Sequence, residues 1–110
     1  MSSPRMTLPT QLVLRALLEE PTREMYGLEV CRAAGLPSGT IHPILTRLEK
    51  AGWLQSRWEK VDPVERGRPR RKYYCLDPNR VGAVLAALQR SDASAQALAR
   101  LRPSLAGEAG

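Results

Sequence analysis

The sequence has few residues of the kinds that bind metals or carry out catalysis. Its 110 residues include two cysteines and one histidine. Cys31 and Cys75 lie far apart and form no C-x-x-C pair, so the usual spacing of zinc ligands is absent. Both are expected to be small, semi-buried apolar residues. His42 has no second histidine and no cluster of acids or cysteines near it, so neither a metal site nor a general base is predicted.

Long hydrophobic runs are also absent. No N-terminal segment resembles a signal peptide, and no stretch is long enough to span a bilayer. We therefore expect a cytoplasmic protein with no membrane partner. The sequence contains no paired acids, no nucleophile with a nearby base and no phosphate-binding loop, which argues against an enzyme. No cofactor is expected.

Acidic residues are outnumbered by basic ones, and the excess is local. The net charge is +6 and the pI is about 10.0. Residues 57–72 hold seven basic and three acidic residues, a net charge of +4, concentrated in the segment ERGRPRRK (65–72). A basic excess of this kind indicates an acidic partner, with nucleic acid first and a membrane surface second.

The first half of the chain is predicted to form three short helices. The first covers residues 8–20, with Thr10 as its N-cap, or Thr7 with Pro9 just inside. The second runs from about Tyr26 to Ala34 and ends at Gly35, with Leu28, Val30 and Cys31 turned inward. The third runs to about Ala51, with Ser38 as its N-cap, and its apolar side consists of Ile41, Ile44, Leu45 and Leu48.

Two strands and a longer helix are predicted to follow. Residues 53–58 and 72–76 read as strands, and the basic Gly/Pro-rich loop between them makes a hairpin. The order of three helices and two strands predicts a winged helix-turn-helix, mainly α with a small β-hairpin. A last helix is expected from Pro78, capped by Asp77, to about Leu101. We divide the chain into a DNA-binding domain (1–77), a dimerisation helix (78–102) and a flexible tail (103–110).

The last helix is expected to hold two copies of the chain together. It carries an apolar stripe, and a domain of this size has little else to cover a helix so long. A self-contained core is the alternative. The predicted homodimer interface joins this helix to the outer side of the first and comprises Leu14, Leu18, Val81, Val84, Leu85, Leu88, Ala95 and Leu98.

The third helix and the loop are the candidate DNA-binding elements. Thr40, His42, Pro43 and Arg47 lie off the apolar stripe, and the N-terminal turns of a recognition helix enter the major groove. A solvated helix face is the alternative. Pro43 is expected to sacrifice little hydrogen bonding there and to present an apolar face to a thymine methyl. The loop arginines suit a narrow minor groove.

Four aromatic residues flank this loop and need a separate interpretation. Trp53, Trp58, Tyr73 and Tyr74 lie on the strands rather than on the loop. We interpret them as core and hairpin residues, with base stacking as the alternative.

Three segments resemble the PadR-type transcriptional regulators: YGLEV (26–30), GTIHPILTRLEKAGWL (39–54) and GRPRRKYYCL (67–76). The resemblance covers about residues 8–80 and implies a winged helix-turn-helix with a C-terminal dimerisation helix, as in the short branch of the family. This sequence has His42 and Leu28 where the family usually has tyrosine. Its last helix also lacks the tryptophan on which short-branch members stack flat aromatic drugs.

The resemblance and the residues together predict a transcriptional regulator, specifically a homodimeric repressor of an inverted-repeat operator in double-stranded DNA. One alternative is a repressor that releases DNA when a small-molecule effector binds at the dimer interface. Another is a winged helix that binds proteins, although that role needs no run of arginines. The predicted DNA-binding residues are Tyr26, Ser38, Gly39, Thr40, His42, Pro43, Arg47, Arg66, Arg68, Arg70, Arg71 and Lys72.

Overall fold

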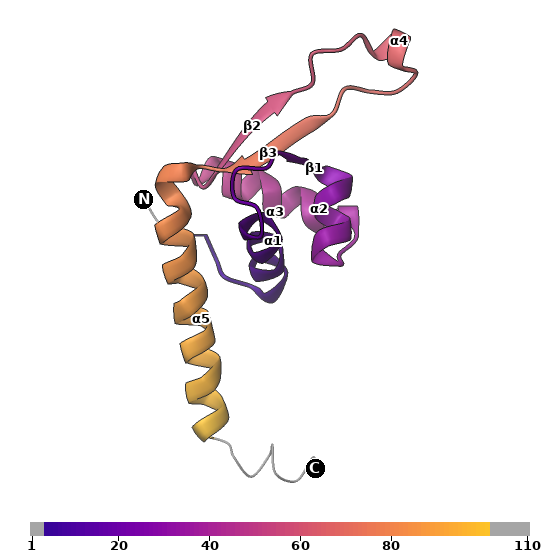
Figure 1. Cartoon of the computed structure of the whole chain (residues 1–110). Coiled ribbons are helices and arrows are strands. Elements are labelled where there is room, and N and C mark those ends of the chain that lie inside the picture. Colours follow the sequence, from indigo (N-terminus) through magenta and orange to yellow (C-terminus); the bar gives the residue numbers. More distant parts are fainter. Residues whose placement is uncertain (1–3, 102–110) are drawn as a thin grey trace.

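The helices and strands follow the order of a winged helix-turn-helix with a long helix after it (Figure 1). The structure is a computed structural model and describes residues 4–101. Its elements are α1 (Leu8–Leu18), β1 (Met25–Tyr26), α2 (Gly27–Ala34), α3 (Ser38–Lys50), β2 (Leu54–Trp58), α4 (Pro63–Arg66), β3 (Lys72–Leu76), the 3-10 helix η1 (Pro78–Arg80) and α5 (Val81–Leu101). The predicted fold class, mainly α with a small sheet, is confirmed.

The ends of the helices lie close to the predicted capping residues. Thr7 caps α1, and its hydroxyl accepts a hydrogen bond from the Thr10 amide at 3.4 Å. Gly35 ends α2 with φ at +70°, a conformation that glycine adopts without strain. The prediction for α3 was wrong by one residue. Pro37 is the N-cap and Ser38 is the first helical residue, because the chain before it is extended at Pro37.

A three-stranded antiparallel sheet connects the helices to the hairpin. Its strand order is β1-β3-β2, and β2 pairs with β3 from Leu54 opposite Leu76 to Trp58 opposite Lys72. The two predicted strands are confirmed. The sequence did not predict β1, in which Met25 pairs with Tyr74, because two residues are too few to show an alternating pattern.

The core lies between α1, α2, α3, the sheet and the first half of α5. Its α3 side consists of Ile41, Ile44, Leu45 and Leu48, which we call the α3 stripe; each of these is at most 2% exposed. In α2, Val30 and Cys31 are buried as predicted, but Leu28 is 50% exposed, so its predicted inward position is wrong. Leu28 lies in the first turn of α2, at the edge of a surface cleft rather than against the core.

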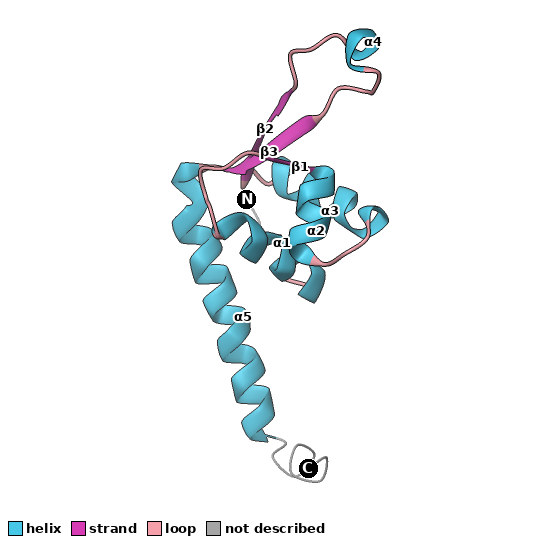
Figure 2. Ribbon diagram, turned by 45° about the vertical axis from the view of Figure 1, so that its right-hand side comes forward, coloured by secondary structure: helices cyan, strands magenta, loops and turns pink. Residues whose placement is uncertain are grey.

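The first half of α5 packs against α1 within the same chain (Figure 2). Val84 and Leu88 are 0% and 4% exposed, and Leu14 on α1 is 0% exposed. Their predicted place in a dimer interface therefore needs correction, because the protomer's own core already covers these three side chains. Leu18 and Val81 are partly buried at the edge of this core.

The second half of α5 extends beyond the rest of the protein. An ion pair at 2.9 Å between Arg15 on α1 and Asp92 joins the two helices there. All side chains from Asp92 to Leu101 are exposed, including Ala95 and Leu98, as is Leu85 nearer the core. The predicted flexible tail, 103–110, lies outside the described residues. Within those residues, the structure contains no helix of the length and hydropathy needed to cross a membrane.

A leucine-to-alanine pair on α1 tests this division between core and surface. Leu14→Ala should lower the free energy of unfolding by about 2–5 kcal/mol, because it empties a fully enclosed site. Leu8→Ala, at a position that is 68% exposed, should change it by less than about 0.5 kcal/mol. Urea unfolding at one fixed protein concentration measures both. Equal effects would contradict the burial of Leu14 in the protomer.

Candidate nucleic-acid interface

Burial of the α3 stripe determines which side chains of α3 face solvent. His42, Pro43 and Arg47 are exposed, and Thr40 is half-buried. Ser38 and Gly39 are exposed at the helix start. Apart from Thr40, the α3 residues predicted to contact DNA therefore lie on the open surface, where they are free to contact another molecule.

Pro43 lies further into α3 than the sequence indicated. Because the helix begins at Ser38, Pro43 is its sixth residue, beyond the first N–H groups that have no acceptor within a helix. Proline has no N–H, so it leaves the Gly39 carbonyl without its helical donor. The expectation that little hydrogen bonding is sacrificed is thus wrong. Gly39 is exposed, however, so this carbonyl can accept a hydrogen bond from solvent or from a ligand.

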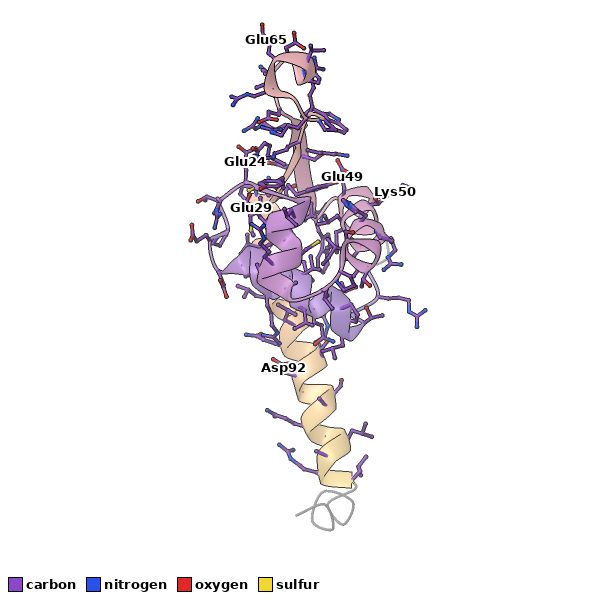
Figure 3. All side chains as sticks on the ribbon, turned by 90° about the vertical axis from the view of Figure 1, so that its right-hand side faces the viewer. Glu24, Glu29, Glu49, Lys50, Glu65 and Asp92 are labelled. Atoms are coloured by element: carbon purple, nitrogen blue, oxygen red, sulfur yellow. The ribbon has the colours of Figure 1, made fainter. Side chains whose placement is uncertain are left out.

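The loop between β2 and β3, residues 59–71, forms the wing. A hydrogen bond from the Glu59 amide to the Arg71 carbonyl, 2.8 Å long, closes its base. Its tip folds into α4, which Asp62 caps by accepting from the Val64 amide at 2.9 Å. Figure 3 shows Glu65 at this tip, far from the helical body. The sequence had suggested an irregular loop here and did not predict α4.

Arg68 is held inside the wing by Glu59. Its guanidinium donates to both carboxylate oxygens of Glu59, at 2.7 and 3.0 Å, and the Arg71 amide donates to the same carboxylate at 3.3 Å. The hydrogen bond from Arg68 lowers the pKa of Glu59 to about 2, helped by the Arg71 amide and by the positive charge of both arginines. Arg68, predicted to face DNA, instead joins the two sides of the wing, and Glu59 already balances its charge.

The other predicted cations of the wing have different surroundings. Arg66 and Arg70 are exposed, and the Arg70 side chain donates to the Val61 carbonyl at 2.9 Å. Arg71 is half-buried, with its guanidinium 4.1 Å from the centre of the Tyr26 ring, a cation–π contact. Among the described residues, no ion pair involves Arg66, Arg70 or Arg71.

Glu49 fastens α3 to the base of the sheet. It accepts a hydrogen bond from the Ser56 hydroxyl on β2 and forms an ion pair with Lys72 on β3, at 3.1 Å. The Ser56 hydrogen bond is the main cause that lowers the pKa of Glu49, and the bond and charge of Lys72 act in the same direction. Figure 3 shows Glu49 on the side toward the wing and Lys50 beside it.

A cleft of about 360 Å³ brings α2, α3 and the hairpin together. Five predicted DNA-binding residues line it, and four others, Gly27, Leu28, Trp58 and Tyr74, complete it. The five are Tyr26, His42, Arg70, Arg71 and Lys72. A larger hollow of about 840 Å³ lies within the wing, but Glu59 and Asp62 among its lining residues make it less suited to an anion. Ser38, Gly39, Thr40, Pro43, Arg47, Arg66 and Arg68 line neither space.

The aromatic residues beside the wing are partly as predicted. Trp53 and Tyr74 are 5% and 7% exposed, so their assignment to the core is confirmed. Trp58 is 59% exposed and lies at the end of β2, opposite Lys72, so it belongs to the hairpin and not to the core. Lys72 Nζ lies 5.8 Å from its ring centre. No group of three or more metal-ligating side chains comes together in residues 4–101.

Known proteins resemble this chain in sequence and structure. Residues 13–79, more than half of the chain, match the Transcriptional regulator PadR-like family. A PadR family regulator from Clostridium difficile R20291 is 20% identical, with a TM-score of 0.64 over 86% of this chain and 98% of that one. A PadR family regulator from Eggerthella lenta is 25% identical, with a TM-score of 0.56 over 86% and 80%.

A third similar structure is that of Bordetella bronchiseptica BpsR, whose DNA binding is regulated by 6-hydroxynicotinic acid. It is 15% identical, with a TM-score of 0.65 over 90% of this chain and 64% of that one. At this identity the likeness concerns the fold alone. No curated protein matches the sequence.

The link between Glu59 and Arg68 makes a testable prediction about pH. The pKa of Glu59 is lowered to about 2, so the link is complete above the carboxyl group's ordinary pKa of 4.5 and is lost as the pH falls toward 2. In Arg68→Ala the Glu59 pKa should rise toward its ordinary value, since its first hydrogen-bond donor is gone. Carboxyl carbon NMR shifts against pH measure this. An unchanged titration in Arg68→Ala would show that Arg68 does not hold Glu59.

Proposed function

Since the chain belongs to the PadR-like family of transcriptional regulators, we propose that it binds an inverted-repeat operator in double-stranded DNA as a homodimer and represses transcription in the cytoplasm. In this proposal α3 enters the major groove, and the wing contacts the backbone and the adjacent minor groove. The function needs no catalytic step and no cofactor.

The cleft between α3 and the hairpin is the observation that carries this proposal. It gathers His42 from α3 and Arg70, Arg71 and Lys72 from the wing and β3 into one surface. Neutral histidine can donate a hydrogen bond to a base or phosphate, or accept one from a base, and arginine suits phosphate because it stays charged and presents several donors. A winged protein that binds only other proteins would not need these cations beside its exposed helix.

The residues of this surface would have two kinds of role. Thr40, His42 and Pro43 lie in the first turns of α3, which reach base edges in this class of motif, so they would read sequence. Arg47 lies one turn further along and would bind a phosphate, as would the exposed Arg70. Arg68 and Lys72 are engaged by Glu59 and Glu49, so they would position the surface more than they bind DNA.

The exposed half of α5 supports the homodimer. Leu85, Leu98 and Leu101 are 46%, 59% and 79% exposed, and none of residues 4–101 covers the helix beyond Asp92. Figure 1 shows this half of α5 projecting away from the winged unit. A second α5 packed against it would cover these leucines and place two α3 helices for the two halves of an inverted repeat.

A ligand-responsive repressor is the second candidate. A hollow of about 320 Å³ lies between α1 and α5, next to the proposed dimer interface, and includes Gln11, Arg90 and Ser91 in its lining. Its guanidinium and polar groups suit a small anion. DNA binding by the similar protein BpsR is regulated by 6-hydroxynicotinic acid. That compound is a small aromatic acid, and its carboxylate would be a small anion. An effector held here would change how the two copies pair and so release DNA.

Substitutions on α3 and the wing should separate sequence readout from general affinity. His42→Ala should narrow the affinity ratio between operator and random duplex by up to about a hundredfold, because a good base contact is worth about 1–3 kcal/mol. Arg47→Ala and Arg70→Ala should each weaken binding to the operator and to the random duplex by the same factor. Each should also reduce the slope of log affinity against log salt concentration by about one unit. Fluorescence anisotropy with an operator selected from random duplexes measures both effects.

Arg15→Ala is the matched control for these arginine variants. It removes the same charge from α1, on the side that faces α5, and should leave the affinity ratio and the salt slope unchanged. A wild-type protein that bound no duplex at low salt would contradict the proposed function and favour a protein-binding winged helix.

A substitution at the end of α5 tests the homodimer. Leu98→Glu should convert dimers to monomers and weaken operator binding, because it places a charge in an apolar contact between copies. Val64→Glu is the control, since Val64 is 87% exposed on the wing tip, away from α5. Light scattering measures the molar mass of each variant. A Leu98→Glu protein that stays dimeric would place the interface elsewhere.

A further inference from the structure

The ring of His42, on α3, lies against Gly27, the first residue of α2. A Cβ added to Gly27 would lie 3.0 Å from His42 Cε1, 3.6 Å from Nε2 and 3.9 Å from Nδ1. Contacts of 3.0 to 3.4 Å are tighter than nearly all real Cβ contacts, so the ring would have to move by a few tenths of an ångström. Gly27 and His42 also line the same cleft. Only a residue without a side chain leaves the imidazole where it is.

The backbone itself does not require glycine at position 27. Among the described residues, the glycines with positive φ are Gly35, Gly52 and Gly67, and Gly27 starts a regular helix. Alanine is the better residue for helical stability, since glycine has more freedom to lose on folding. An added Cβ would meet nothing within 4 Å at the helical glycines Gly39 and Gly82. Gly27 therefore differs from them in its contact with His42.

We propose that Gly27 is a positioning residue that sets the place of the His42 imidazole on the outer face of α3, and thereby the sequence selectivity of the protein. The inference rests on the proposed function, in which His42 contacts DNA. Because His42 is exposed, a side chain at position 27 would displace its ring toward solvent without disturbing the α3 stripe. Hydrogen bonds to base edges depend steeply on distance and angle, so a small displacement changes recognition while the fold is kept.

The backbone that carries Gly27 is anchored to the sheet. It is half-buried, and its helix is fixed at this end by the hydrogen bond from the Tyr26 amide to Glu29, at 3.2 Å. Tyr26 in turn belongs to β1, which pairs with β3 at Tyr73. The start of α2 is thus anchored to the sheet. Gly27 then sets how closely the His42 ring, which comes from α3, can approach α2.

A double-mutant cycle tests the proposal, because a residue that acts only through another has no effect once that partner is removed. Gly27→Ala should lower the ratio of operator to random affinity about three- to tenfold, as expected for a weakened but not abolished base contact. In a His42→Ala background the same substitution should leave the ratio unchanged within about twofold. Gly82→Ala is the matched control, a helical glycine with open space around it, and should leave the ratio unchanged.

Two measurements on the free protein complete the design. His42 is the one histidine of the 110 residues, so its ring resonances need no assignment among others. A nuclear Overhauser effect between the Gly27 α-protons and the His42 ε1 proton should be present in the wild type, and Gly27→Ala should shift the ring resonances. The Tm of Gly27→Ala should be unchanged or slightly raised, because alanine favours the helix.

The outcomes separate this inference from the proposed function. If no duplex sequence is selected by the wild type, the proposed function fails, and the role of Gly27 in selectivity fails with it. If an operator is bound but Gly27→Ala keeps the wild-type ratio, the inference alone is overturned. It is also overturned if Gly27→Ala still lowers the ratio in the His42→Ala background, since Gly27 would then act without His42. A missing Overhauser effect would contradict the contact.

Discussion

Burial of the α3 stripe is the constraint on which the rest of the surface depends. Four apolar side chains at helical spacing, each at most 2% exposed, leave α3 one rotation about its axis. Any other rotation would take these side chains into water and bring polar ones into the core. His42, Pro43 and Arg47 are therefore exposed because of residues that are themselves buried in the core. Glu49, on the same helix, then ties this orientation to the sheet through Ser56 and Lys72.

The sequence predicted those parts of the fold that arise from local patterns. Apolar spacing located α1, α2, α3 and α5. Thr7 and Gly35 marked ends of α1 and α2, and Asp77 marked the start of η1, which leads into α5, because capping depends on neighbouring residues. β1 escaped prediction because its two residues become a strand only by pairing with β3, more than forty residues later. The short α4 depends on one turn closed by Asp62 and Gly67, which compete with an irregular loop of similar composition.

The sequence predicted which kinds of residue make up the candidate site, but it did not predict which of them contact one another. A sequence gives the number of charges on a segment but not which of them meet, so Arg68 seemed as free as Arg70. The structure places Arg68 against Glu59, nine residues away, and Lys72 against Glu49, twenty-three residues away. The apolar stripe of α5 was recognised, but Val84 and Leu88 could be assigned to a partner copy only while the position of α1 was unknown. The approach of Gly27 to His42 likewise exists only in three dimensions.

The exposed half of α5 has a consequence for how operator occupancy depends on the concentration of this protein. If two chains must pair through α5 before one operator is filled, the concentration of competent complex grows with the square of the concentration of free chains. Doubling expression would then raise that complex about fourfold while most chains are single. A dimer formed through this half of α5 would thus make operator occupancy rise more steeply than in proportion to the amount of the protein, as long as most chains are single.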